Sequence, residues 1–163
     1  MSVIRLVWGA ASGPTAMSSY DAALAEANVH DFNLVTVSSV VPEGAAIEAV
    51  GTAPALGPAG DRLTVVQSRA TVGPEAAGPA VAGIGWARGA GEDGPGPGIF
   101  YEATGTDPAS VRTDIQMGLD HGASLREWET AESDHVLREA PAADGAYTTQ
   151  VVCAVYGESR PIL

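Results

Sequence analysis

Lysine is absent from this sequence of 163 residues, and all eight of its basic residues are arginines. Enzymes that stabilise a carbanion commonly use pyridoxal phosphate, which a lysine holds as a Schiff base. That route is closed in this chain. If the protein performs carbanion chemistry, its electron sink must come from another source. A carbonyl group derived from a serine is one of the few sinks that a chain can make unaided.

Basic clusters and long apolar runs are also missing. Nucleic acids bind through counterion-releasing contacts with clustered arginine or lysine, so we expect no nucleic-acid partner. No segment is long and apolar enough to predict a membrane span, and the first residues lack the pattern of a signal peptide. We therefore expect a cytoplasmic protein that makes no membrane contact.

Cys153 is the only cysteine, which excludes a disulfide within the chain. It lies in an apolar run at residues 151–156, where we expect it to be a small buried hydrophobic side chain. The three histidines, His30, His121 and His135, show no metal-ligand spacing and have no cysteine beside them. The sequence therefore predicts no metal site.

Acidic residues dominate the charge and give the chain a net charge of −12. Such a charge destabilises a compact protein by self-repulsion, which concentrated salt screens. We interpret it as the mark of a salt-adapted organism. An acidic protein from a mesophile with GC-rich DNA is the alternative. The length predicts a single domain, residues 1–163, that is large enough for a proper hydrophobic core.

Apolar runs separated by glycine and proline predict a chain made mostly of strands. A helix is expected over residues 20–28, capped by Ser18 or Ser19, and a longer one from Asp107 and Pro108 to near Gly122. Residues 43–60 and 89–98 are expected to be surface loops, because they are rich in glycine and proline. Two helices are too few for a doubly wound fold, so we predict an α+β fold with a mixed sheet. The strands are expected at residues 4–8, 32–40, 63–71, 81–87, 99–103, 125–129, 134–138 and 147–156.

The strand predicted at residues 32–40 ends in two serines, Ser38 and Ser39, and Pro42 cannot continue its ladder. A serine there can attack the carbonyl carbon of the residue before it, if the turn holds the peptide in a strained and exposed geometry. The chain would then cut itself and make its own electrophile. A plain strand-end turn is the alternative, because the pair Ser18 and Ser19 is interpreted as helix capping alone.

Three further residues add to this pattern. Asn33 precedes Ser39 on the same predicted strand, so its amide could face the serine and donate to an oxyanion. Glu102 lies beside aromatic residues, which remove water from its carboxyl group and suit it to be a general acid. Asp21, in the first helix, could pair with a guanidinium group. The alternatives are a turn residue for Asn33, a surface charge for Glu102 and a helix-dipole contact for Asp21.

The segments that carry these residues resemble the pyruvoyl-dependent arginine decarboxylases of archaea and some bacteria. The resemblance extends from Val3 to Tyr156, which is nearly the whole chain. It departs from the family's pattern in a longer glycine-rich stretch before Ile99, and in Glu43 and Gly44 after the proline. The motifs are Tyr-Asp-Ala-Ala-Leu at residues 20–24, Asn-Leu at 33–34, Val-Ser-Ser-Val-Val-Pro at 37–42 and Gly-Ile-Phe-Tyr-Glu-Ala-Thr-Gly at 98–105.

This resemblance implies that the chain cleaves itself. Ser39 would attack the carbonyl carbon of Ser38, and Asn33 would support the oxyanion. The products would be a β chain of residues 1–38 and an α chain of residues 39–163, which begins with a pyruvoyl group and stays associated with the β chain. The pyruvoyl group would serve as the cofactor, with no pyridoxal phosphate and no metal.

The resemblance also implies a substrate and an assembly. Arginine would lose carbon dioxide at the pyruvoyl group and become agmatine. Glu102 would protonate the carbanion, while Asp21 and Ser38 would bind the substrate. The family is similar in fold to trimeric αββα sandwiches whose active sites lie between subunits, so a homotrimer or a dimer of trimers is expected. Two alternatives stay open: a pyruvoyl-dependent decarboxylase of another amino acid, and an acidic oligomeric binding module that never cleaves itself.

Overall fold

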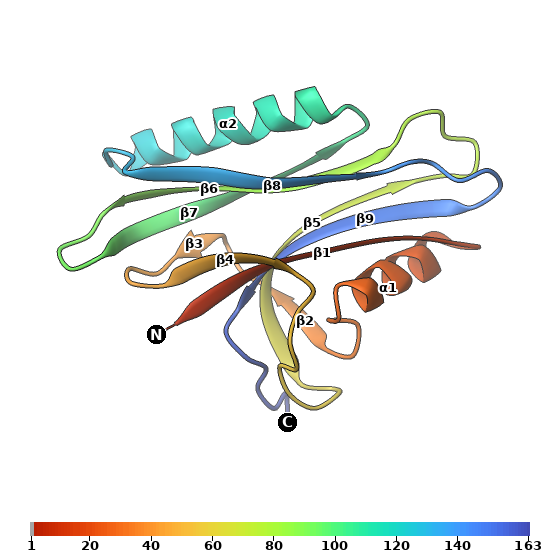
Figure 1. Cartoon of the computed structure of the whole chain (residues 1–163), viewed down its shortest axis with the longest axis horizontal. Coiled ribbons are helices and arrows are strands. Elements are labelled where there is room, and N and C mark those ends of the chain that lie inside the picture. The colour runs from red at the N-terminus through yellow and green to blue at the C-terminus, as the bar shows by residue number, and fades with distance from the viewer. Residues whose placement is uncertain (1) are drawn as a thin grey trace.

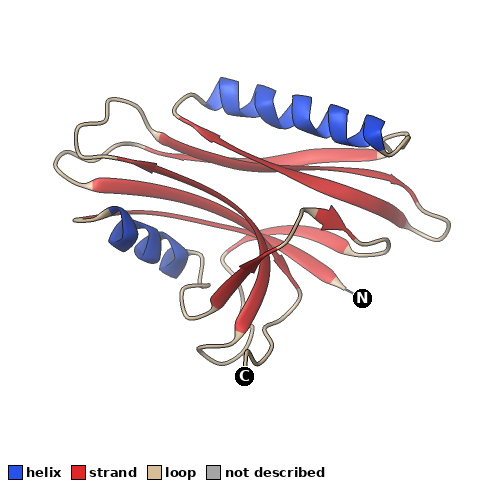
Figure 2. Ribbon diagram, turned by 180° about the vertical axis from the view of Figure 1, so that it is seen from behind, coloured by secondary structure: helices blue, strands red, loops and turns tan. Residues whose placement is uncertain are grey.

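Two β-sheets lie face to face in the computed structural model, which describes residues 2–163 (Figure 1). One helix covers the outer face of each sheet, as Figure 2 shows from the other side. The order of layers is helix, sheet, sheet, helix, because each sheet must bury one face against the other sheet and one against its helix. The predicted α+β fold of αββα type is therefore confirmed.

The five-stranded sheet carries α1 (Ala16–Glu26) on its outer face. The pairs β2 with β5 and β1 with β4 are parallel, while β9 pairs antiparallel with both β5 and β1. Strand β9 lies at the centre of the sheet and is almost entirely buried, as its apolar β-branched sequence predicts. In order across the sheet, the strands are β2 (Asn33–Thr36), β5 (Arg62–Val72), β9 (Tyr147–Tyr156), β1 (Val3–Gly13) and β4 (Ala46–Gly51).

The four-stranded sheet is antiparallel throughout and carries α2 (Pro108–Leu125) on its outer face. Its edge strand β3 has only two residues, which pair with Gly98 and Ile99. The neighbouring strand therefore has no strand partner on that side beyond Ile99. In order across the sheet, the strands are β3 (Val40–Val41), β7 (Pro95–Gly105), β6 (Ala80–Ala90) and β8 (Glu132–Ala140).

The hydrophobic core has three parts, one between the sheets and one beneath each helix. Between the sheets, Leu6 and Val66 of one sheet meet Ile84 and Phe100 of the other. Beneath α2, Ile115 lies directly over Gly85, where the Cβ of any other residue would overlap the isoleucine side chain. The glycine thus lets the helix approach the sheet closely, which brings α2 near the open edge of β7.

The strand predicted at residues 32–40 is wrong as a single element. Strand β2 ends at Thr36 in one sheet, and β3 begins at Val40 in the other. The N–H of Val37 still donates to the carbonyl of Val65 at 3.1 Å, so the chain leaves the first sheet at Ser38. An apolar β-branched run predicts extended backbone, but it does not reveal which strand each half will pair with.

Helix α1 differs from its predicted bounds at both ends, and α2 differs only at its C-terminal end. Helix α1 begins a turn early, with Thr15 as its N-cap, and Ser18 completes a capping box at the third helical position. Helix α2 begins as predicted, with the Asp107 side chain accepting from the N–H of Ser110 at 3.1 Å. It continues past Gly122 because that glycine packs against Ile99 instead of ending the helix. The strand predicted at residues 125–129 is wrong for this reason.

Two predicted loops contain strands. Residues 43–60 include β4, which pairs in parallel with β1. Residues 89–98 are mostly a hairpin, because β6 runs to Ala90 and β7 starts at Pro95. The glycines of this hairpin permit a close approach of two backbones: a Cβ on Gly96 would meet the carbonyl oxygen of Ala90 at 2.6 Å. Close packing of the backbones therefore accounts for part of the glycine content of this tract.

Other parts of the structure bear on the type of site. Cys153 is fully buried, as predicted, and burial raises the pKa of its thiol to about 12. Within residues 2–163, no group of three or more histidine, cysteine and acidic side chains is arranged to hold a metal ion. None of the helices described is long and apolar enough to cross a membrane.

Candidate active site

The serine pair lies where the chain crosses from one sheet to the other. On the far side of the crossing, the N–H of Phe100 donates to the carbonyl oxygen of Ser39 at 2.8 Å. This bond lies just beyond the two pairs that β3 makes with β7. Ser38 and Ser39 therefore form a short bridge whose far end is fixed to the open edge of β7.

Ser39 has a strained backbone. Its φ angle is +70°, in the left-handed region that residues with a Cβ rarely adopt. This conformation costs about 1–2 kcal/mol per residue for an L-amino acid, and such strain persists only where the surrounding structure imposes it. A strained and accessible peptide is the geometry that attack by Ser39 on the preceding carbonyl requires.

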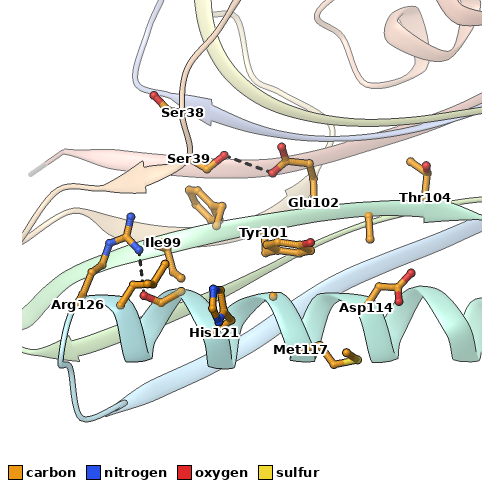
Figure 3. Close-up of a pocket in the computed structure, with 15 residues that line it drawn as sticks. Ser38, Ser39, Ile99, Tyr101, Glu102, Thr104, Asp114, Met117, His121 and Arg126 are labelled. Atoms are coloured by element: carbon orange, nitrogen blue, oxygen red, sulfur yellow. Dashed lines mark hydrogen bonds between the residues drawn. The ribbon is translucent and has the colours of Figure 1, made fainter.

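Glu102 is the acid that the fold brings to Ser39. The Ser39 hydroxyl donates to Oε2 of Glu102 at 3.3 Å, and Figure 3 shows the two side chains pointing toward one another above β7. The side chain of Glu102 is exposed in this chain, so the desolvation expected from its aromatic neighbours is not provided within one subunit. The contact between Ser39 and Glu102 is a finding of the structure that the sequence did not predict, and the expected loss of water around Glu102 is wrong within this chain.

A cavity of about 840 Å³ opens beside the serine pair. This volume lies in the range of pockets that hold small molecules. Gly118 shapes one wall, because a Cβ on this residue would overlap the ring of Tyr101, which lies flat against the helix. The lining comes from the serine bridge, from β7 and from α2, namely Ser38, Ser39, residues 99–104, Asp114, Met117, Gly118, His121, Gly122, Leu125 and Arg126.

The side of α2 next to β7 contributes residues that sequence reasoning missed. Asp114, His121 and Arg126 line the cavity, and Asp114 and Arg126 bring charges of opposite sign to it. Met117 and Leu125 leave 65% and 69% of their surface exposed beside the same cavity, which is unusual for large apolar side chains. A signal was present, since positions 114, 118, 121 and 125 repeat at helical spacing along one flank of the buried face.

Tyr156, at the end of β9, is a second residue that the sequence did not single out. Its hydroxyl donates to the carbonyl oxygen of Val40 at 2.8 Å, and its ring meets that of Phe100 edge to face. Burial, with a further effect of the negative charge of Glu102, raises the pKa of the Tyr156 hydroxyl to about 12. The hydroxyl therefore stays protonated and can donate across the neutral pH range.

Asn33 and Asp21 do not reach the serine bridge within this chain. Asn33 lies on β2, and its amide donates to the carbonyl of Gly60 at 2.7 Å instead of facing Ser39. The expectation that Asn33 and Ser39 share one strand is wrong, because that strand ends at Thr36. Asp21 is exposed on α1, which covers the other sheet, and it does not line the cavity.

Comparison with known proteins shows what kind of protein carries this site. A family model described as pyruvoyl-dependent arginine decarboxylase matches residues 3–161. The chain belongs to this family. Two curated relatives named pyruvoyl-dependent arginine decarboxylase, from two strains of Halobacterium salinarum, are each 45% identical to it over 99% of this chain and 98% of their own length.

The family agrees with the predictions made from the motifs and from the charge. Its members are enzymes that depend on a pyruvoyl group, as the family's description states. The relatives from a halophile fit the salt adaptation inferred from the net charge of −12. The site itself suits a pyruvoyl group, because Ser39 combines a strained backbone, a carboxylate partner and an adjoining cavity.

Proposed function

We propose that this protein is a self-processing arginine decarboxylase, which converts arginine to agmatine and carbon dioxide with a pyruvoyl group made from Ser39. The observation that carries the proposal is the geometry of Ser39. Its backbone is strained, and its hydroxyl donates to Glu102 at the mouth of a cavity of suitable size. Family membership over nearly the whole chain supports the same reaction.

Cleavage would begin with attack of the Ser39 hydroxyl oxygen on the carbonyl carbon of Ser38. The peptide C–N bond breaks as the new ester C–O bond forms, and the nitrogen of residue 39 becomes a free amine. Elimination then removes the Cα proton of residue 39 and breaks its Cβ–O bond, which leaves a carboxylate on Ser38 and dehydroalanine at position 39. Water hydrolyses this product to a pyruvoyl group and releases ammonia. The strain at Ser39 favours the first step, because opening the peptide relieves it.

In turnover the pyruvoyl group supplies the electron sink for decarboxylation. The N–H of Phe100, which donates to the carbonyl oxygen of Ser39, stabilises negative charge that develops on that oxygen. Glu102 faces the same position and delivers a proton to the carbanion left by carbon dioxide. Both groups are fixed on β7, so their spacing is set by one strand.

Substrate recognition and assembly are linked in this proposal. The relatives are named as arginine decarboxylases. Arginine carries a guanidinium group that the carboxylate of Asp21 can bind through two hydrogen bonds. Asp21 and Asn33 both lie outside the cavity of their own chain. Their roles in guanidinium binding and in cleavage therefore require a neighbouring subunit, in agreement with a trimer or a dimer of trimers. Ser38 lines the cavity and would contact the substrate. The variant Asp21→Ala should mainly raise KM for arginine.

Two alternatives remain distinguishable from this proposal. A decarboxylase of another cationic amino acid would use the same machinery, and only substrate profiling separates it from an arginine enzyme. A binding module that never cleaves itself would need neither the strained Ser39 nor its carboxylate partner. The contact between these two side chains favours an enzyme.

The first experiment is intact-mass spectrometry of the purified protein under denaturing conditions, before and after a carbonyl-reactive reagent. We expect two fragments that divide between Ser38 and Ser39, with the larger one blocked at its N-terminus and labelled by the reagent. Incubation with arginine and other amino acids then identifies the substrate by release of carbon dioxide. A single full-length species after long incubation in concentrated salt would contradict the proposal and favour the binding module.

A further inference from the structure

Arg88, on β6, is a buried cation that has no acidic partner. Only 2% of its surface is exposed, and within residues 2–163 no carboxylate lies within ion-pair distance of it. Its guanidinium group donates to backbone carbonyl oxygens instead. Nε and Nη2 bond to Gly96 at 3.0 and 2.8 Å, Nη2 also reaches Pro42 at 3.3 Å, and Nη1 bonds to Ala45.

Burial of an unpaired charge is costly unless its hydrogen bonds are all satisfied, so such a residue is rarely kept for packing alone. Two of the three carbonyls that Arg88 binds, those of Pro42 and Ala45, belong to the segment immediately after the serine bridge. This segment would form the start of the larger fragment after cleavage. The third carbonyl, at Gly96, belongs to the hairpin that lies beside it.

A glycine on the neighbouring strand makes room for the Arg88 side chain. Arg88 lies opposite Gly98 in the pairing of β6 with β7, and Gly98 lies opposite Val41 in the pairing of β7 with β3. A Cβ on Gly98 would lie 3.0 Å from Cγ of Arg88 and 3.4 Å from Cβ of Val41. Because Gly98 has no side chain, the side chain of Arg88 can cross β7 and reach the carbonyl oxygens of the segment that follows β3.

Tyr156 holds the same segment from the opposite sheet. Its hydroxyl donates to the carbonyl of Val40, one residue after Ser39. Tyr156 of β9 thus binds the carbonyl oxygen of residue 40, and Arg88 of β6 binds the carbonyl oxygens of residues 42 and 45. The N–H of Phe100 donates to the carbonyl oxygen of residue 39. On the other side of the scissile bond, Ser38 makes none of the hydrogen bonds found in residues 2–163.

We propose that Arg88 and Tyr156 form a clamp on residues 40–45 that keeps residue 39 in place before and after the chain is cut. The inference rests on the proposed function. Before cleavage, the clamp holds the backbone of Ser39 in its strained conformation. After cleavage, residue 39 is a chain end, and chain ends lose order unless they are tied down. Strand β3 alone supplies only two residues of pairing, and the two side chains add hydrogen bonds to three carbonyls of this segment.

The clamp makes Arg88 and Tyr156 positioning residues, whose effects should fall on cleavage rate and kcat more than on KM. Tyr156→Phe removes one hydroxyl and keeps the ring contact with Phe100. We expect cleavage to slow and kcat of the cleaved fraction to fall, each about 3- to 10-fold, which is the value of one hydrogen bond. Arg88→Met should have a larger effect on both, and Arg88→Lys, which keeps the charge but not the fork of donors, should restore part of it.

The experiment follows cleavage by intact mass over time, and measures kcat, KM for arginine and thermal unfolding on the cleaved fraction. The matched control is Arg138→Met, because Arg138 lies over the ring of Trp8 on the surface and contacts no carbonyl of residues 40–45. The control should cleave and turn over as the wild type does. If Arg88→Met does not fold, Tyr156→Phe decides the question.

The outcomes separate this inference from the function on which it rests. If the wild-type protein stays uncut, the proposed function fails and the clamp fails with it. If the wild type is cut and active, but Tyr156→Phe and a folded Arg88→Met match it in cleavage rate and kcat, only the clamp is overturned. A rise in KM with unchanged kcat and cleavage would likewise overturn it, because that pattern indicates substrate binding and not positioning.

Discussion

The two segments on either side of the Ser38–Ser39 bond are held in different ways. Upstream, β2 is an edge strand with four residues, three of them exposed, that pairs with β5 through its backbone. Downstream, β3 has two residues, yet carbonyls along residues 39–45 accept hydrogen bonds from β7, β9 and β6. The difference shows that placement near the scissile bond depends on donors from distant strands and not on strand length. The side that would carry the cofactor is the more firmly held.

The largest effect should come from removing the nucleophile on the downstream side. Ser39→Ala is expected to fold and to remain one uncut, inactive chain, because no other hydroxyl can attack the Ser38 carbonyl from position 39. Ser38→Ala is the matched variant on the upstream side, and its chain should still be cut. Intact mass under denaturing conditions measures both. Cleavage that persists in Ser39→Ala would show that the nucleophile is assigned wrongly.

The acid that faces the downstream side gives the next largest effect. Glu102→Gln should still cleave itself to some extent, because strain at Ser39 also promotes the attack. Turnover of the cleaved fraction should fall by about 100-fold or more, the usual loss when a proton donor is removed. Release of carbon dioxide from arginine by a known amount of pyruvoyl protein measures this effect. Wild-type turnover in Glu102→Gln would remove the acid from the reaction.

A side chain added at Gly98 should disturb the hydrogen bonds of Arg88 to the segment after Ser39, while Ser39 and Glu102 stay unchanged. Gly98→Ala puts a Cβ 2.7 Å from the carbonyl oxygen of Ala87 and 3.0 Å from Cγ of Arg88. Overpacking of this kind costs about 1–3 kcal/mol, so we expect a lower free energy of unfolding and slower cleavage. Gly73→Ala is the control, since no atom lies within 4 Å of its added Cβ. Denaturant unfolding and intact mass measure the two variants side by side.

The smallest effect is on how the free energy of unfolding depends on pH, and it distinguishes Tyr156 from Cys153. Burial raises the pKa of Tyr156 from 10.0 and that of Cys153 from 9.0, each to about 12. The folded state therefore keeps protons that the unfolded chain loses, and the free energy of unfolding should fall as pH rises from 9 toward 12. In Tyr156→Phe the fall above pH 10 should be smaller, while Cys153→Ala should reduce the fall that begins at pH 9. Denaturant unfolding at a series of pH values measures both slopes.

Features that depend on neighbouring residues in the chain could be predicted from the sequence. The start of α2 at Asp107 and Pro108 was predicted correctly, and so were the bounds of β9. Ser39 and Glu102, which the motifs singled out separately, lie within hydrogen-bond distance of each other, and their catalytic roles stay a proposal. The cavity wall from α2 was missed, because an exposed helix face with His121 and Arg126 looks like ordinary solvated surface.

Contacts between distant segments could not be predicted. Nothing local indicates that residues 32–40 divide between two sheets, or that Asn33 turns to Gly60 instead of Ser39. The hydrogen bonds of Arg88 join β6 to residues some 45 positions away, and that pairing exists only once three strands lie side by side. A glycine-rich tract such as residues 89–98 predicts a loop by composition, yet it forms a tight hairpin because the two backbones touch.

By itself the sequence limited the chemistry that we propose: a chain without lysine cannot hold pyridoxal phosphate as a Schiff base, and the serine pair is a possible source of another electrophile. It also indicated the α+β class, because apolar periodicity is a local property of the chain. The tertiary structure alone decided where the proposed chemistry would take place. The strain at Ser39, its contact with Glu102 and the hold on residues 40–45 all arise from strands far apart in sequence, and only the packed sheets bring them within hydrogen-bond distance.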